Sequence, residues 1–335
     1  MRWLGCFGGL VAVVAAGLAF MCANGVSDGS VPLFHVGADY GLHETSIPSL
    51  SGKTVLVTGA SSGLGLGVAR LLARKHATLI ITCRDEAKCA AAIRDIQAGT
   101  VATAENVRCV PMELLELRSV RAAGAAIGEL LASKPLDLLV LNAGIMMPPR
   151  LQLGPVDGLE IQFQTNHLGH FLLLHALLPS LRAARDPRVV AVSSVAHWFS
   201  PPAEELMRVA ALNDAAAYSP VAWYGFSKLC NILMARELHR REPHIGAYAV
   251  HPGGVQGKLM RFLPLPARVV AAFERLVYWD IETAALTVIA PLVVARARMA
   301  PGAYLVPIAR ERSPSAQAAS EALGRRLWEW SSAWI

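Results

Sequence analysis

The sequence predicts a single α/β domain with a doubly wound parallel sheet, preceded by an N-terminal membrane segment. Short apolar runs alternate with helical stretches from Lys53 onward, a glycine-rich turn follows the first run, and residues 3–23 carry no charge. Runs that are apolar on both faces are typical of buried parallel strands. Their alternation with helices indicates right-handed crossovers within one sheet.

The apolar runs predict where the strands lie. Six runs rich in Val, Ile and Leu predict strands at residues 53–58, 77–82, 107–112, 137–142, 188–194 and 245–250. The stretches between them predict helices at residues 63–75, 85–97, 118–132, 159–181 and 223–241. Residues 303–306 predict a last strand. Pro264 and Pro266 exclude one continuous helix across residues 257–280.

Composition narrows the function classes. The chain has 335 residues, of which 54% are hydrophobic and only 17% are charged, as suits a membrane-associated protein. The net charge is +6, but the arginines are scattered, so nucleic-acid binding is not expected. The six cysteines form no Cys-x-x-Cys pair and no zinc spacing, which predicts no metal site. Those within predicted elements are interpreted as small buried apolar residues: Cys83, Cys89, Cys109 and Cys230.

Residues 3–23 are long enough to cross a bilayer as a helix. An uncleaved anchor is favoured over a secretory signal peptide, although Ala23 offers a small residue for cleavage. Arg2 before the segment and acids after it would place the domain on the lumenal side, but this rests on one arginine and leaves the orientation open. Residues 24–50 are predicted to be a linker or a wrap-around arm, and residues 51–335 the catalytic domain.

A glycine-rich turn follows the first predicted strand, in the string Thr58-Gly59-Ala60-Ser61-Ser62-Gly63-Leu64-Gly65. Gly59 permits a tight turn, while Gly63 and Gly65 let the backbone approach a phosphate. The N-terminus of the following helix would then face a pyrophosphate with free N–H groups. The alternative is an ordinary glycine-rich turn.

Arg84 follows the second predicted strand and bears on the choice of cofactor. An acid at this point usually binds a free ribose 2′-OH, whereas an arginine suits a 2′-phosphate. Arg84 therefore favours NADP(H) over NAD(H), although the adjacent Asp85 weakens the argument. The alternative is that Arg84 is a solvated residue at a helix start.

Tyr224 and Lys228 are four residues apart and share one face of a predicted helix. A nearby ammonium group favours the phenolate form of tyrosine, which we expect to lower its pKa toward a range useful for acid–base catalysis. Ser193 and Ser194 end the fifth strand, where a hydroxyl could bind a substrate carbonyl. The alternatives are a surface Tyr/Lys pair and simple capping by the serines.

Together these motifs resemble those of the short-chain dehydrogenase/reductase family, with a Rossmann-type sheet, from about Lys53 to the C-terminus. The resemblance implies a catalytic group made of Asn166, Ser194, Tyr224 and Lys228. It implies cofactor contacts at Gly59, Ser61, Ser62, Gly63, Leu64, Gly65, Arg84, Glu113, Asn142, Ala143, Gly144, Tyr224, Lys228, Pro252, Gly253 and Val255. Glu113 stands where the family usually has Asp, and Gly257 where it usually has Thr.

Within the family, three strings resemble the retinol dehydrogenase and WW-domain oxidoreductase branch, without a WW domain: residues 166–171, 193–197 and 327–331. The resemblance implies hydride transfer between NADP(H) and a lipophilic alcohol or carbonyl such as a retinoid, a steroid or another lipid. It also implies a single-pass anchor in a membrane, that of the endoplasmic reticulum. A homodimer stays open, and the alternative function is a catalytically silent NADP(H)-binding scaffold. His167, His170 and His197 are interpreted as packing or capping residues.

Overall fold

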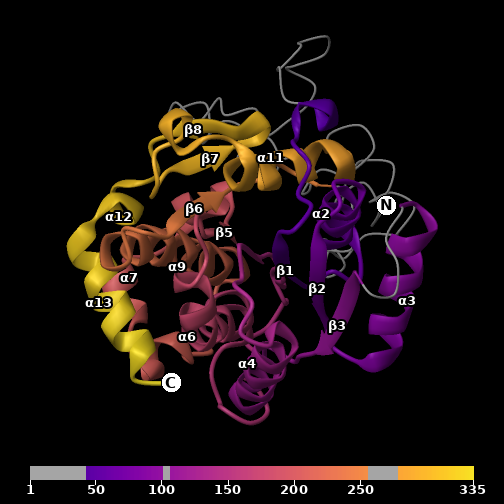
Figure 1. Ribbon diagram of the computed structural model, residues 1–335. Coiled ribbons are helices and arrows are strands. Elements are labelled where there is room, and N and C mark those ends of the chain that lie inside the picture. Colours follow the sequence, from indigo (N-terminus) through magenta and orange to yellow (C-terminus); the bar gives the residue numbers. More distant parts are fainter. Residues whose placement is uncertain (1–42, 101–105, 256–277) are drawn as a thin grey trace, which may run out of the picture.

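An eight-stranded sheet runs through the middle of the molecule (Figure 1). The computed structural model describes residues 43–100, 106–255 and 278–335. The strands are β1 (Thr54–Thr58), β2 (Thr78–Cys83), β3 (Val107–Pro111), β4 (Leu138–Leu141), β5 (Arg188–Val192), β6 (Gly246–Val250), β7 (Tyr304–Val306) and β8 (Arg310–Arg312). Their order is β3-β2-β1-β4-β5-β6-β7-β8, and only the β7–β8 pair is antiparallel among the described strands.

Helices cover both faces of this sheet (Figure 1). One face carries α2 (Gly63–Arg74), α3 (Glu86–Ala98) and α11 (Ile281–Val293). The other carries α4 (Leu117–Leu131), α6 (Gly169–Arg182) and α9 (Pro220–Arg241). Successive strand residues point to opposite faces, so Val55 and Val57 join the core under α2 while Leu56 joins the core under α6. This double burial explains why the strands are apolar throughout.

Shorter elements complete the chain between and after the main helices. They are η2 (Glu44–Ser46), α5 (Ile161–Phe163), the π-helical turn η3 (Gln164–Leu168), η4 (Val195–Phe199), α7 (Ala203–Leu206), α8 (Val209–Leu212), η6 (Arg296–Arg298), η7 (Pro307–Ala309), α12 (Ala316–Ala319) and α13 (Glu321–Ser332).

The predicted doubly wound sheet is confirmed, with each strand within two residues of its predicted bounds. The helix predicted at residues 159–181 is wrong as one α-helix, because the π turn η3 interrupts it between α5 and α6. Strand β8 and helices α7, α8, α11 and α13 are elements that the sequence did not predict.

Helix α13 runs along the outer side of α9 and closes the core on that face (Figure 1). Trp328 meets the ring of Phe171 edge-on, with the centroids 4.9 Å apart. His167 Nε2 lies 3.0 Å from the Ser331 hydroxyl. These contacts join the C-terminal helix to the helical segment that carries Asn166.

Residues just before position 51 pack on the sheet. Ile47 and Leu50, within the predicted linker, are buried against the α2 side of the sheet. Arg74 of α2 makes a bidentate ion pair with Glu44. Residues 3–23 lie outside the described residues, and the described residues include no helix long and apolar enough to span a membrane.

Two of the cysteines correct the sequence interpretation. Cys89 of α3 and Cys109 of β3 form a disulfide, with Cα atoms 5.6 Å apart. Treating this pair as small apolar residues was wrong, because α3 packs on β3 and brings two distant positions together. The interpretation is confirmed for Cys83 and Cys230, which are free and buried.

Breaking the disulfide should destabilise the domain. The two cysteines are 20 residues apart, and releasing such a loop in the unfolded chain costs about 3 kcal/mol of the free energy of unfolding. We expect Cys89→Ser to lose about this amount in urea unfolding under oxidising conditions. In a thiol reductant, the wild type and the variant should have similar free energies of unfolding. A difference that persists in the reductant would assign the loss to packing.

Candidate active site

The glycine turn at the end of β1 fits only glycine at two positions. Gly59 has φ of 68°, and a Cβ there would lie 2.8 Å from Ala143 Cβ. A Cβ at Gly65 would overlap the Asn142 amide and the Gly59 carbonyl. The predicted turn residues Ser61, Ser62, Gly63 and Leu64 join these glycines to the first turn of α2.

The start of α2 is suited to an anion. Ser62 is extended at the N-cap position, and its side chain makes no capping hydrogen bond. The first N–H groups of the helix therefore have no side-chain acceptor from the N-cap, and the helix dipole favours negative charge there. This cradle fits the pyrophosphate of a dinucleotide.

The turn at 142–144 is tied to the end of β1 by hydrogen bonds. The backbone N–H groups of Asn142 and Ala143 donate to the Thr58 hydroxyl at 2.9 and 3.1 Å. The Asn142 side chain donates to the Thr58 carbonyl at 2.8 Å. Two predicted cofactor motifs, far apart in sequence, thus form one rigid edge.

Tyr224 and Lys228 both lie in the first half of α9 and are 6% and 4% exposed. The Lys228 Nζ lies 5.6 Å from the centroid of the Tyr224 ring and donates to the Val192 carbonyl at 3.0 Å. The predicted one-face arrangement of the pair is present. The end of β5, where Val192 lies, fixes the position of the lysine.

The two serines after β5 have different partners. The buried Ser193 hydroxyl donates to the Lys228 carbonyl at 2.7 Å and holds α9 on the sheet. The Ser194 hydroxyl accepts from the Ala196 N–H at 3.1 Å and lies close enough to the Tyr224 phenol to lower its pKa. Ser194, the second of the pair, is therefore the serine placed to act with the tyrosine.

Asn166 lies in the π turn η3, an irregularity that is frequent at functional sites. Its side-chain oxygen accepts from Ile145 N–H at 2.8 Å, and its amide nitrogen donates to the Ile145 carbonyl and the Ser227 hydroxyl at 3.0 and 2.9 Å. Asn166 is fully buried and joins the strand β4 exit to α9.

Gly144 shows that the predicted catalytic group converges. A Cβ at this position would lie 3.1 Å from Asn166 Oδ1 and 3.6 Å from Lys228 Nζ. The π turn η3 and the helix α9 therefore meet within contact distance of this glycine. Only a residue without a side chain leaves this space open for a cofactor.

Burial is the main cause of the pKa shifts of Tyr224 and Lys228. It raises the pKa of the Tyr224 phenol, while the hydrogen bond with Ser194 acts in the opposite direction. Burial also lowers the pKa of Lys228 to about 8. The expectation that Lys228 lowers the tyrosine pKa was wrong for the chain by itself, because desolvation opposes the phenolate and the ammonium points to the Val192 carbonyl. The resting tyrosine is a phenol that can donate a proton.

Arg84 is exposed directly after β2, at the edge where an adenosine ribose would lie. Asp85 caps α3 by accepting from the Lys88 N–H at 2.8 Å and also binds the Lys88 ammonium. The neighbouring acid thus has its own partner. Glu113 follows β3 and accepts from the Leu115 N–H at 3.1 Å, so its carboxylate shapes its own loop.

Beyond β6, the chain turns at Gly253, which has φ of 89°. Pro252 is buried, and Val255 forms a parallel bridge with Trp279. Gly257, Pro264 and Pro266 belong to residues 256–277, which lie outside the described residues.

The sequence missed two tyrosines near this group. Tyr278 packs at Gly254 and is close enough to Tyr224 to raise its pKa. The Tyr218 hydroxyl donates to the Pro148 carbonyl at 3.0 Å, and Gln162 accepts from the Met147 N–H at 2.7 Å. These contacts hold the segment that leaves the 142–144 turn. Neither residue belongs to a short motif, so spacing alone could not identify them.

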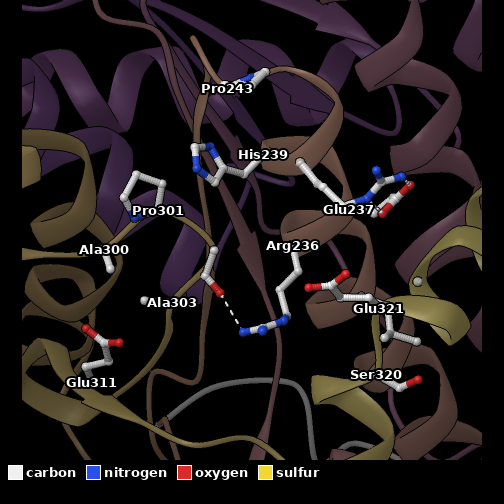
Figure 2. Close-up of a pocket in the computed structure, with 14 residues that line it drawn as sticks. Arg236, Glu237, His239, Pro243, Ala300, Pro301, Ala303, Glu311, Ser320 and Glu321 are labelled. Atoms are coloured by element: carbon white, nitrogen blue, oxygen red, sulfur yellow. Dashed lines mark hydrogen bonds and ion pairs between the residues drawn. The ribbon is translucent and has the colours of Figure 1, made fainter.

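A separate cavity of about 510 Å³ lies at the other end of α9 (Figure 2). Arg236 extends into it and donates to the Gly302 carbonyl at 3.1 Å. Arg236 is 12 residues beyond Tyr224, which places it about 18 Å farther along the helix. None of the predicted site residues lines this cavity, so it is not the catalytic pocket.

Known proteins resemble this chain in sequence. The profile of the short chain dehydrogenase family matches residues 53–205. Retinol dehydrogenase 12 of Bos taurus is 42% identical over 214 residues, covering 63% of this chain and 64% of that protein. The chain thus aligns with slightly less than two thirds of that relative. Retinol dehydrogenase 13 of Homo sapiens is 32% identical over 321 residues, covering 93% of this chain and 89% of that protein.

A solved structure shares the fold. RhlG of Pseudomonas aeruginosa, determined as an active-site complex with NADP, is 27% identical with a TM-score of 0.60. The superposition covers 77% of this chain and 95% of that chain.

Filling the space at Gly144 should impair turnover more than folding. In Gly144→Ala the new methyl group would displace Asn166 or Lys228 by a few tenths of an ångström, and we expect turnover to fall roughly tenfold because catalytic geometry tolerates little displacement. The measurement is kcat with a nicotinamide cofactor, beside thermal unfolding. Gly128→Ala is the matched control, because a Cβ there has no neighbour within 4 Å. Equal kcat in both variants would contradict the assigned convergence.

Proposed function

This chain belongs to the short-chain dehydrogenase/reductase family, on the branch of the retinol dehydrogenases, and is an NAD(P)-dependent oxidoreductase; we propose that it transfers hydride between NADP(H) and a lipophilic alcohol or carbonyl. The observation that carries the proposal is the convergence of Asn166 and Lys228 at Gly144, with Tyr224 on the same helix as Lys228 and Ser194 close enough to act on the Tyr224 pKa. A proton donor, a carbonyl anchor and a cation then surround one reaction space.

Each residue has one task in carbonyl reduction. When bound, the nicotinamide supplies the hydride. Ser194 donates a hydrogen bond to the carbonyl oxygen, and the Tyr224 phenol gives that oxygen its proton as negative charge develops. The Lys228 ammonium holds the nicotinamide ribose. Asn166 fixes the turn at 144–145 against α9 and would hold the water that links Lys228 to solvent. In oxidation the same residues act in reverse.

We assign the cofactor preference to Arg84. Its guanidinium follows β2 and is exposed, while the competing acid, Asp85, is engaged by the Lys88 side chain and backbone. A free guanidinium suits a ribose 2′-phosphate, which carries two acceptor oxygens in the geometry that arginine recognises. The NADP complex of the similar RhlG supports this preference.

The substrate is proposed to be a lipid alcohol or aldehyde, such as a retinoid or a steroid. Support comes from the names of the retinol dehydrogenase relatives and from the apolar composition of residues 257–280. An N-terminal anchor at residues 3–23, in the membrane of the endoplasmic reticulum, would deliver such molecules from the bilayer.

Removing the tyrosine hydroxyl tests this function. We expect Tyr224→Phe to lower kcat by about 10² to 10⁴, the usual contribution of a positioned general acid. The assay is a panel of lipid carbonyls and alcohols with NADPH/NADP and with NADH/NAD. NADPH should be the better donor, and higher kcat/KM with NADH would refute the argument from Arg84. NADPH binding without a Tyr224-dependent turnover of any substrate would indicate a scaffold.

The pH dependence should report Lys228. Its pKa is lowered to about 8, so its positive charge is lost as pH rises through that value, whereas the Tyr224 phenol keeps its proton through this range. We expect kcat/KM for NADPH to be level below pH 8 and to fall roughly tenfold per pH unit above it. Lys228→Arg keeps its charge and should lose this break, even if its activity is lower. The same break in that variant would assign the titration to another group.

A further inference from the structure

His170 lies between the cofactor turn and the catalytic asparagine. It is fully buried in the first turn of α6. Its Nδ1 lies 3.1 Å from the Asn166 carbonyl, and its Nε2 lies 2.9 Å from the Thr58 hydroxyl. One imidazole therefore joins the end of β1 to the π turn, two elements that are 112 residues apart at this contact.

The partners of the ring define its tautomer. A carbonyl oxygen only accepts hydrogen bonds, so His170 Nδ1 carries the hydrogen that it donates to Asn166. Burial lowers the pKa of His170 to about 4, so the ring is neutral at pH 7 and Nε2 is an acceptor. The Thr58 hydroxyl must then donate to Nε2, while it accepts from the N–H groups of Asn142 and Ala143. The same hydroxyl also lies 3.4 Å from the Val140 carbonyl, so Nε2, at the shorter distance, is the better acceptor for its hydrogen.

The π turn explains why a side chain is needed here. In such a turn the backbone hydrogen bonds run one residue farther than in an α-helix, which disturbs the regular partners of the carbonyls. The imidazole supplies a fixed donor to the carbonyl of Asn166 at this irregular point. This bond holds the backbone of Asn166 and leaves its side chain free for its own contacts with Ile145 and Ser227.

The chain of hydrogen bonds continues to the catalytic helix. Asn166 Nδ2 donates to the Ser227 hydroxyl at 2.9 Å, and that hydroxyl donates to the Tyr224 carbonyl at 2.8 Å. Buried polar contacts thus run without a break from the cofactor turn through His170 to α9. Buried networks whose members are all paired fix one geometry, because any shift leaves a polar group unpaired.

We propose that His170 is a positioning residue that sets the catalytic asparagine relative to the bound cofactor. Through Nε2 it orients Thr58 and with it the 142–144 turn, and through Nδ1 it holds the backbone of Asn166. The inference rests on the roles proposed above for Asn166 and the turn. It separates His170 from His167, which is equally buried but bonds Ser331 of α13, away from the site.

Two substitutions at His170 each remove one of the two hydrogen bonds of the imidazole. In His170→Asn the side-chain amide can replace Nδ1 but does not reach Thr58. In His170→Gln the amide reaches the place of Nε2 but no longer caps the Asn166 carbonyl. We expect His170→Asn to weaken NADPH binding about tenfold and to lower kcat less. We expect His170→Gln to lower kcat about tenfold and to weaken binding less, since an unpaired buried group costs about this factor.

The controls distinguish positioning from packing. The dissociation constant of NADPH is measured by nicotinamide fluorescence, kcat by turnover, and folding by thermal unfolding. His167→Gln removes an equally buried ring and should change stability alone. Thr58→Val removes the link to His170 together with the acceptor for the Asn142 and Ala143 N–H groups, so it should weaken NADPH binding at least as much as His170→Asn. The double variant should show no loss beyond that of Thr58→Val, because the link to His170 is already absent there.

Several outcomes would overturn the proposal. Equal losses of binding and turnover in both His170 variants, matched by His167→Gln, would assign the residue to core packing. Unchanged NADPH affinity in His170→Asn would overturn it whatever the turnover shows. A wild type that binds NADPH but turns over no substrate, with Tyr224→Phe unchanged, would instead refute the proposed function. In that case the NADPH dissociation constants of His170→Asn and Thr58→Val would still test whether the link between His170 and Thr58 orients the cofactor turn.

Discussion

The site depends on the boundary between β1 and β4, where the order of the parallel strands reverses. The chain leaving β1 turns into α2 on one face, while the chain leaving β4 continues toward the helices of the other face. Such a boundary opens a crevice at the carboxyl ends of the strands. Here Thr58 spans that crevice, since its hydroxyl and carbonyl bind the 142–144 turn across it. The glycine turn, the exit of β4 and the catalytic helix are positioned from this edge.

Burial then sets the chemistry. Tyr224, Lys228, Asn166 and His170 are all nearly or fully inside the protein, so charge is unfavourable there until a partner arrives. The tyrosine rests as a phenol and the lysine is weakly basic. Contacts made by a bound cofactor would therefore change the pKa values of both groups. In the chain by itself the protonated tyrosine favours proton donation, which matches the reductive direction.

Much of the fold and the site could be predicted because their signals are local. Strands buried on both faces appear as apolar runs, and Gly59 and Gly65 stand where no side chain fits. Other features depend on tertiary contacts that no spacing encodes. Cys89 and Cys109 pair only because α3 packs on β3, and residues 159–181 look like one helix although Asn166 lies in a π turn. The ionisation of Tyr224 was mispredicted because its burial was not visible in a four-residue spacing.

Helix α13 has a consequence for biosynthesis. Trp328 and Ser331 of this helix contact Phe171 and His167, more than 150 residues earlier. A nascent chain on the ribosome therefore carries the aromatic face of α6 uncovered until α13 has been synthesised. Exposed apolar surface of this kind attracts chaperones and promotes aggregation. The core beside Asn166 is therefore sealed only after α13 has been made, long after the segments that it covers.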